Sequence, residues 1–420
     1  MTATELTRAG ASHRRRMRAR SPHEPHRTAT PLELLFDLVF VVAISEAAQG
    51  LHHALGSGHV TDGLLGYLTV FFAIWWAWMN FTWFASAYDC DDVPYRLAVF
   101  VQITGALILG GGVPKMFETQ QLNLATVGGY VVMRMAAVTQ WLRAGAADPE
   151  RRTTTRRYAL GVTLLQIAWV GLLFLNPRLF LPAFVVLAVL ELFVPVWAER
   201  AVSTTWHPHH IAERYGLLTL IVLGETILAA TMAVRSALDM GETFSTLAPL
   251  IIGGLLIVFS MWWYYFDRPV HDLLTSLRKA VVWGYGHYFV FAAAAAVGAG
   301  LTVAVDHAAH HENGRTVSVA GLAAAGAGAR SEATGVDALG PVGAGAAVAI
   351  PVATYVLSLW FLHDRPEYRQ TRAYGPIAAA LILLTPFSGH AVLLTGIVLA
   401  STLAVKLLVL GGTPHEASSS

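Results

Sequence analysis

Two apolar segments of the chain carry charged residues of the kind that bind protons or cations inside a membrane. The first, PLELLFDLVFVVAIS at 31–45, holds Glu33 and Asp37, and Glu46 follows it directly. Glu33 and Asp37 are four residues apart, so a helix would place both carboxylates on one face. Like charges on one face repel each other unless a cation or a proton lies between them. The pair could therefore bind a cation or a proton, or cap the start of the helix, where acidic residues are favoured.

The second segment, HHIAERYGLLTLIVLGET at 209–226, places His210 and Arg214 four residues apart, with Glu213 between them. Arg214 and Glu225 lie on one stripe of a helix, but about 16 Å apart along its axis, which is too far for an ion pair. Each therefore needs a partner on another helix. His210 and Glu213 also have an HxxE spacing, which occurs in di-metal helix bundles. Such sites need a second motif or more carboxylates, and no second copy is obvious, so a metal enzyme is the minority hypothesis.

Arg134, in YVVMRMAAV, falls in the middle of an apolar segment. Burying this cation in a membrane costs roughly 2.5–3.5 kcal/mol on insertion scales, so it needs a carboxylate partner. Three glutamates lie at a compatible depth: Glu46, Glu225 and Glu191. A structural ion pair and a ligand-binding or ion-binding role both remain open for it. The candidate polar site consists of the charged residues in apolar segments: Glu33, Asp37, Glu46, Arg134, Glu191, His210, Glu213, Arg214 and Glu225.

The composition indicates a membrane protein. The chain has 420 residues, of which 55% are hydrophobic and 13% are charged, whereas soluble domains average about 25% charged residues. Apolar runs of about twenty residues recur along the chain, as transmembrane helices require. We therefore expect an all-α polytopic integral membrane protein with about twelve spans, near 32–54, 63–87, 95–112, 122–142, 158–175, 179–198, 209–234, 244–266, 280–304, 338–362, 374–386 and 389–410. The segment 374–410 could be two helices broken at PFSGH, or one span and a re-entrant piece.

Charge predicts the orientation of these helices. Residues 1–30 hold seven arginines and no apolar core, so they form a basic disordered tail and not a signal peptide. If this tail is cytoplasmic, twelve spans place most of the 28 lysines and arginines on the same side, as the positive-inside rule requires. We expect a bacterial inner-membrane protein with both termini in the cytoplasm. The tail would contact anionic lipid and not nucleic acid.

Similar segments recur in the same order, which favours two parallel six-helix repeats. ELLFDLVFVVAISEA at 33–47 resembles ERYGLLTLIVLGETI at 213–227, and the following spans end in aromatic residues before Asp89 and Asp267. Glu46 and Glu225 would then be symmetry-related. Basic loops and aromatic span ends are also common in unrelated membrane proteins, so this alternative stays open. The expected domains are 1–30, 31–205, 206–412 with a flexible external loop at 306–337, and a tail at 413–420.

Other functional motifs are missing. The sequence contains no phosphate-binding glycine loop, zinc-protease helix or nucleophile elbow, and we expect no cofactor and no enzymatic activity. Its single cysteine, Cys90, excludes an internal disulfide. The acidic cluster YDCDD, with Asp89, Asp91 and Asp92, is expected to be a solvated turn, to attract cations, or to pair with Arg96.

The segments ELLFDLVFVVAIS, HIAERYGLLTLIVLGETILA and WWYYFD resemble the bacterial low temperature requirement protein A family, over about residues 31–400. The resemblance implies a multi-span inner-membrane protein without a settled biochemical activity. Leu35 stands before Phe36, where many members of the family carry a second aromatic residue. Residues 306–337 look like an insertion that is specific to one lineage of the family.

We therefore expect a membrane transporter or ion-permeation protein whose partners are the bilayer and a small ion or solute. Glu46, Arg134, Glu213, Arg214 and Glu225 would form its polar centre, with Glu33 and Asp37 at the inner mouth. The alternatives are a membrane sensor or scaffold with purely structural ion pairs, and a membrane-embedded enzyme that uses His210 and Glu213.

Overall fold

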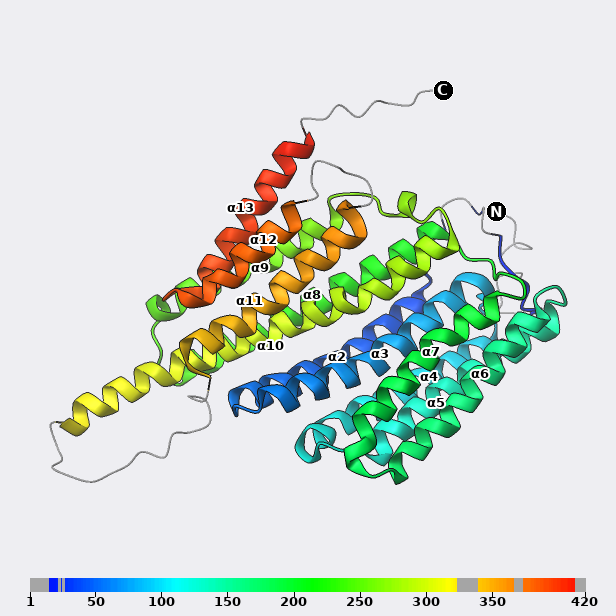
Figure 1. Cartoon of the computed structure of the whole chain (residues 1–420), viewed down its shortest axis with the longest axis horizontal. Helices are drawn as coiled ribbons and strands as arrows, with labels where there is room; N and C mark the ends of the chain where they lie inside the picture. Colours follow the sequence, from blue (N-terminus) through cyan, green and yellow to red (C-terminus); the bar gives the residue numbers. More distant parts are fainter. Residues whose placement is uncertain (1–14, 22–23, 25–26, 323–338, 366–372, 412–420) are drawn as a thin grey trace, which may run out of the picture. The chain divides into compact units, whose positions relative to one another are not determined.

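The computed structural model describes residues 15–21, 24, 27–322, 339–365 and 373–411, and this part of the chain is helical without a β-strand (Figure 1). The predicted segments correspond in order to twelve α-helices in these ranges. Their bounds are α2 Pro31–Gly56, α3 Val60–Tyr88, α4 Val93–Thr119, α5 Leu124–Ala147, α6 Arg152–Gly171, α7 Phe180–Glu199, α8 Pro208–Asp239, α9 Phe244–Phe266, α10 Leu277–Leu322, α11 Gly340–Leu359, α12 Tyr374–Leu384 and α13 Ala391–Gly411.

In the described ranges, ten helices are long and apolar enough to cross a membrane. The chain is therefore an integral membrane protein. Helix α5 is not among the ten, and it carries the charged Arg134 and Arg143. Helix α12 is also excluded because its 11 residues extend only about 16 Å, roughly half the thickness of the hydrocarbon core. Residues 374–410 are thus two helices broken within PFSGH, the first too short to be a full span.

Two expectations about loops and tails differ from the structure. Helix α10 continues through Leu322, so 306–322 is helical and does not belong to a flexible loop. This alanine-containing segment has no proline, and alanine has the highest helix propensity. Residues 15–21, 24 and 27–30 pack against the helices instead of forming a free tail, since Met17 is 1% exposed and Arg27 is 5% exposed. The predicted loop residues 323–337 and the tail 413–420 lie outside the described residues.

The chain forms two compact units. Unit 1 contains residues 1–47 and 66–218, and unit 2 contains 48–65 and 219–420. Helices α2 and α8 each contribute their first part to unit 1 and their last part to unit 2. The domain boundaries at 31–205 and 206–412 and the relation of the halves as repeats stay predictions.

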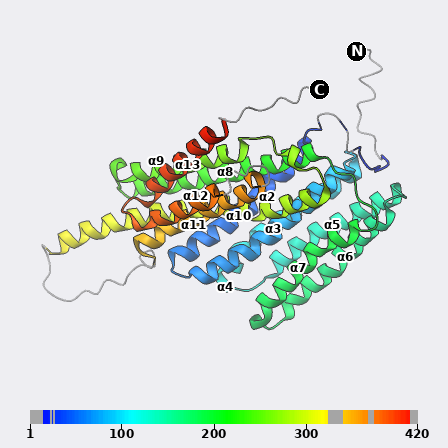
Figure 2. The same ribbon diagram turned by 45° about the horizontal axis from the view of Figure 1, so that its top comes forward.

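In unit 1, α4 packs on α5, α5 on α6, and α6 on α7, and Figure 2 shows these helices side by side. Glycines allow α4 and α5 to approach closely. A Cβ atom added at Gly105 would lie 2.7 Å from the carbonyl oxygen of Gly129 on α5. Small residues at helix crossings are the usual means by which membrane helices bring their backbones together.

We expect Gly105→Ala to destabilise unit 1 by about 1–3 kcal/mol, because the new methyl group overlaps backbone that cannot move independently. Gly111→Ala is the matched control on the same helix, since a Cβ atom there has nothing within 4 Å. The control should be neutral or slightly stabilising, because alanine favours the helix over glycine. Detergent unfolding curves of both variants check this, and equal stability of the two would contradict the close crossing.

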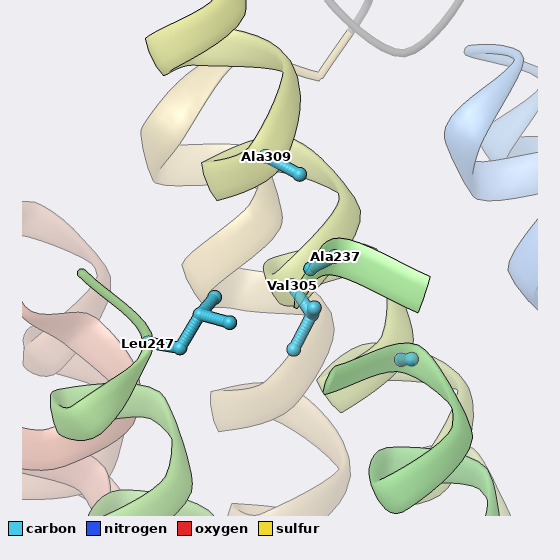
Figure 3. Close-up of a cluster of buried hydrophobic side chains, with 5 residues drawn as sticks. Ala237, Leu247, Val305 and Ala309 are labelled. Carbon is cyan, nitrogen blue, oxygen red and sulfur yellow. The ribbon is translucent and has the colours of Figure 1, made fainter. Parts of the chain in front are cut away.

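In unit 2, α10 packs on α11, and α9 packs on α13. A small apolar cluster joins the end of α8 to α9 and α10, formed by Ala233, Ala237, Leu247, Val305 and Ala309 (Figure 3). Three of its five side chains are alanines, so the three helices meet there with little side-chain volume between them.

Candidate functional site

The first two turns of α2 and α8 bring four of the predicted site residues into one buried cluster in unit 1. The Arg214 guanidinium donates two hydrogen bonds to the Asp37 carboxylate, from Nε to Oδ2 at 3.0 Å and from Nη2 to Oδ1 at 2.6 Å. Its Nη1 lies 3.0 Å from Glu33 Oε1, and His210 Nε2 lies 3.1 Å from the same oxygen. Asp37 also accepts a hydrogen bond from Trp78 Nε1 at 2.6 Å. We call Glu33, Asp37, His210 and Arg214 the carboxylate cluster.

The capping role predicted for the acidic pair of α2 occurs in the structure, at Glu33. Glu33 Oε2 accepts a hydrogen bond from the backbone N–H of Thr30 at 2.7 Å, and the Thr30 hydroxyl accepts one from the Glu33 N–H at 3.3 Å. This reciprocal arrangement is a capping box, which stabilises the helix start. The other oxygen of Glu33 faces the cations, and Asp37 lies one turn deeper. Glu33 is thus a cap and a member of the cluster at once.

The carboxylate cluster contains more negative than positive charge. Its four side chains are 0% exposed, and the two carboxylates share one guanidinium. If His210 is neutral, one negative charge is left without compensation within the cluster. Isolated charge in a buried site is strongly disfavoured. A bound proton or a monovalent cation would make the cluster neutral.

Several buried polar atoms around this charge have no hydrogen-bond partner. They include Glu33 Oε1, both ring nitrogens of His210, and Arg214 Nη1, whose short contacts have ion-pair distances without hydrogen-bond angles. The hydroxyl of Tyr95, on α4, is equally buried and unpartnered, and it lies within electrostatic range of Glu33, Asp89 and Arg214. Buried polar groups are otherwise almost always paired. Glu33 Oε1, a His210 ring nitrogen and the Tyr95 hydroxyl can therefore accept a hydrogen bond without losing an existing one, whereas Arg214 Nη1 can only donate one.

Part of the N-terminal segment lies at the same end of unit 1. Arg27 donates hydrogen bonds to the carbonyl oxygens of Ala85 and Ser86 in the last turn of α3. The His207 ring is hydrogen-bonded through Nε2 to the Glu24 carbonyl oxygen at 2.8 Å. Cations are favoured at helix C-termini, where carbonyl groups lack partners. The segment is therefore held in place by the end of α3 and by the residues that precede α8.

The acidic turn between α3 and α4 is more ordered than a solvated loop. Burial and the neighbouring Glu33 raise the pKa of Asp89 to about 6, against the attraction of Arg20 and Arg27. Burial also raises the pKa of Asp92. Hydrogen bonds from Arg143 and from backbone N–H groups lower it by more, so that the pKa of Asp92 is about 2. Only Asp91 makes the predicted pair with Arg96, at 2.7 Å. Asp89 is thus a buried carboxyl that titrates close to physiological pH.

A second buried ion pair in unit 1 identifies the carboxylate partner of Arg134. Arg134 Nη2 donates to Glu191 Oε2 at 2.8 Å, and the two side chains are 3% and 0% exposed. Glu191 accepts further hydrogen bonds from four other side chains, namely Trp76, Tyr130, Gln166 and Trp169. Every lone-pair direction of this carboxylate is in use. Arg134 therefore pairs with Glu191, and not with Glu46 or Glu225.

Three predicted site residues do not join either group. Glu46 and Glu225 are half-buried, and they belong to different units. Glu213 is half-buried beside Arg214 in the chain, and its buried Oε2 has no hydrogen-bond partner. The expected single polar centre is therefore wrong in one respect, because Arg134 and Arg214 lie in separate groups of contacts, each with its own carboxylates.

Comparison with known proteins identifies the family to which the chain belongs. The family model of the bacterial low temperature requirement A protein (LtrA) matches residues 28–411, which include every helix described above. The chain belongs to the LtrA family. It is also 29% identical over 272 residues to an uncharacterized protein of Rhizobium meliloti (strain 1021), over 61% of this chain and 64% of the relative. The chain thus aligns with a little under two thirds of that relative's length.

Unit 2 of this LtrA chain holds a third buried group, which the sequence did not predict. Lys406 on α13 is 2% exposed, and its Nζ lies 2.9 Å from Asp267 Oδ2 and 3.1 Å from Asp364 Oδ1. Arg268 lies 3.7 and 3.8 Å from the same two carboxylates. Two cations thus face two anions, and this group is balanced in charge. His287 on α10 is hydrogen-bonded to Tyr265 on α9 at 3.1 Å.

Unit 1 of the LtrA chain also contains a small apolar pocket of about 50 Å³, lined by residues that include Met116, Thr126, Tyr130, Trp169 and Phe184. Tyr130 and Trp169 also donate to Glu191, so the pocket borders the Arg134–Glu191 pair. Such a volume could admit a water molecule, but cavities with apolar walls stay dry. In the described residues, no group of three or more metal-ligating side chains is arranged to hold a metal ion.

Proposed function

We propose that this LtrA protein is an ion-coupled transporter of the bacterial plasma membrane, and that the carboxylate cluster binds the coupling proton. The observation that supports the proposal most directly is that Glu33 and Asp37 share the single guanidinium of Arg214, with His210 Nε2 3.1 Å from Glu33 Oε1. Intramembrane carboxylates and histidines that face other helices are the usual proton carriers of transporters. The transported partner is a small ion or solute, and the proposal includes no catalytic step and no cofactor.

Charge explains why proton binding would be coupled to a change of conformation. With a proton on the cluster, the two carboxylates, the guanidinium and the imidazole together have no net charge, and the buried arrangement is stable. Without the proton, one negative charge is buried, so a conformation that admits water or a cation becomes favoured. A ligand shifts such an equilibrium in proportion to its differential affinity for the two conformations. Proton binding and release would in this way open the site alternately to the two sides of the membrane.

The proposed orientation follows from the distribution of basic residues. Arg20, Arg27 and Arg143 lie at the end of unit 1 where α2 begins and α3 ends. Basic residues are enriched on the cytoplasmic side of bacterial membrane proteins. We therefore propose that this end, together with both termini, faces the cytoplasm.

A pH jump applied to proteoliposomes on a solid-supported membrane tests the proposal without knowledge of the solute. The wild type should show a transient charge displacement as protons bind the cluster. Asp37→Asn should reduce this displacement at least about tenfold, because Glu33 and Arg214 then balance each other without a proton. Glu150→Gln, in an exposed loop position with a 69% exposed side chain, is the matched control and should behave as the wild type.

The same vesicles can be supplied with a panel of radiolabelled ions and small solutes under a pH gradient. Uptake that depends on the gradient and is lost in Asp37→Asn and in His210→Gln supports coupled transport. We would abandon the proposal if the wild type gave neither charge displacement nor uptake. Unaltered displacement in both cluster variants would equally remove the cluster from the mechanism.

A second candidate function is a membrane sensor or scaffold whose buried charges only hold helices together. The observation in its favour is the Arg134–Glu191 pair, whose carboxylate, on α7, is saturated with donors from α3, α5 and α6. A saturated carboxylate has no free position for a transported ion. In this view the ion pairs would determine stability, and no variant would alter charge movement.

A further inference from the structure

The apolar pocket of unit 1, which the transport proposal does not use, lies where four helix ends meet. The last turns of α4 and α6 and the first two turns of α5 and α7 contribute wall residues, among them Met116, Trp169, Thr126 and Phe184. Helix α3 adds Thr69, Val70 and Ala73. Of these seven side chains only that of Ala73 is half-buried, and the other six are buried. The pocket therefore lies within the helix bundle and is not a depression of its outer surface.

The polar side chains of the wall already use their hydrogen-bond donors within the protein. Both threonine hydroxyls donate to the backbone carbonyl oxygen three residues earlier in the chain, each at 2.9 Å. The Tyr130 hydroxyl and the Trp169 indole N–H donate to Glu191 Oε1 at 3.3 and 3.1 Å. A polar ligand would lose its hydrogen bonds to water and find none of these donors available, which is costly. The wall therefore selects an uncharged apolar group.

The shape of the wall is partly fixed and partly adaptable. The Trp169 ring packs edge to face against the rings of Tyr130 and Phe184, with centroids 6.0 and 5.2 Å apart. This is a favoured arrangement of aromatic rings, so the three rings hold one another in place. Met116, in contrast, has a flexible side chain that adjusts to irregular surroundings. Such a wall can follow the shape of an alkyl chain.

Large apolar side chains are exposed at the same end of unit 1. Phe174, between α6 and α7, is 83% exposed, and Leu124, the first residue of α5, is 77% exposed. On an integral membrane protein, such side chains face the hydrocarbon of the bilayer. Phe174 follows the wall residue Trp169 by five residues, and Leu124 precedes the wall residue Thr126 by two. Surfaces that face lipid are thus continuous along the chain with the wall of the pocket.

We propose that this pocket binds the methyl end of an acyl chain of a bilayer lipid. A volume of about 50 Å³ takes roughly three to five carbon atoms, and a chain enters by its free end because the other end is tied to the headgroup. The bound atoms gain van der Waals contacts with the wall. Tyr130 and Trp169 are wall residues as well as donors to Glu191. A bound chain end therefore holds two donors of the Arg134–Glu191 pair in place, whether or not the protein is a transporter.

Fluorescence quenching by brominated phosphatidylcholine in nanodiscs tests the assignment on the full-length protein. The difference between each protein and the same protein with Trp169→Phe isolates the emission of Trp169. Trp169 lies in the last turn of α6, so lipids that only surround the protein should quench it more strongly with bromine near the headgroup. A bound chain end reverses this order. We expect bromine in place of the terminal methyl group to quench Trp169 at least about twofold more strongly than bromine near the headgroup.

Two substitutions at one helix provide the matched variants. Leu109→Phe adds volume at a buried wall residue of α4 and should restore the order expected of surrounding lipid. Leu107→Phe makes the same change at an exposed position of α4 and should behave as the wild type. Ala73→Leu fills the pocket from α3 and replaces Leu109→Phe if that variant does not fold.

The outcomes separate the possible occupants of the pocket. Stronger quenching from the headgroup side in the wild type would overturn the proposal, and so would an order that both filling variants leave unchanged. Dissolved xenon, which enters apolar cavities, is the second probe. Quenching of Trp169 by xenon without the reversed order of the lipids would mean that the pocket takes small free molecules, and the assignment to an acyl chain would be wrong.

Discussion

Arg214→Met is expected to lower the free energy of unfolding by about 3–5 kcal/mol, because it leaves two buried carboxylates without their shared cation. Arg214 is 0% exposed and is the only residue that contacts both Glu33 and Asp37 by ion pairs in the described structure. Methionine fills a similar volume, so the loss of charge is separated from the loss of packing. Unfolding in mixed detergent micelles, with each variant compared to the wild type, measures the effect.

Arg214→Lys is the first control for this prediction. Lysine keeps the positive charge but cannot reproduce the two parallel hydrogen bonds to Asp37 at 3.0 and 2.6 Å. It should therefore cost clearly less than methionine. The double variant Arg214→Met with Asp37→Asn should recover part of the stability, because it removes one of the orphaned charges. If Arg214→Met were as stable as the wild type at neutral pH, the cluster would not be held by charge, and the argument for a bound proton would lose its basis.

The number and order of the helices could be predicted from the sequence because membrane spans are long apolar runs with clear breaks. The break between α12 and α13 falls within PFSGH as expected, since proline and glycine end helices. The end of α10 could not be placed because alanine-containing polar sequence is compatible with both a helix and a loop. The order of the N-terminal segment could not be predicted for a similar reason. Its composition indicates disorder, and only the contacts of Met17 and Arg27 with the helices show otherwise.

The members of the carboxylate cluster could be recognised individually, but their partners could not. A spacing of four residues places Glu33 with Asp37, and His210 with Arg214, on single faces. No local pattern indicates that these two faces meet, since that depends on the packing of helices far apart in the chain. The same limit applied to Arg134, for which three glutamates had suitable depth and the packing of α5 against neighbouring helices selected Glu191.

Asp89, Tyr95 and Lys406 were missed because each resembles a residue with an ordinary role. Asp89 belongs to an acidic turn that looks solvated, and Tyr95 and Lys406 lie in the end turns that interfacial residues commonly occupy. Their burial is the signal that separates them from solvated residues, and burial at helix ends follows only from the tertiary structure. The pairing of Asp91 with Arg96, in contrast, is a contact between near neighbours in the chain, and it is one of the three alternatives that the sequence offers.

Glu191→Gln is expected to destabilise unit 1 by about 3–5 kcal/mol, because Arg134 would become a buried cation without a carboxylate. The amide retains one carbonyl oxygen for the donors that now surround the carboxylate, but its N–H₂ group would face Trp or Arg donors. Arg134→Met alone should cost less, since the remaining carboxylate keeps four hydrogen-bond donors. The unfolding free energies of both single variants give the two sides of a double-mutant cycle.

The double variant Arg134→Met with Glu191→Gln decides between a structural and a transport role for this pair. It leaves no buried charge, so it should be more stable than Glu191→Gln alone, with a coupling energy of about 1–3 kcal/mol. If the pair is structural, the double variant should also regain the charge displacement of the wild type after a pH jump. Restored stability without restored charge movement would instead place Arg134 and Glu191 on the transport path. The Glu191 carboxylate would then have to release some of its five hydrogen-bond donors during the transport cycle.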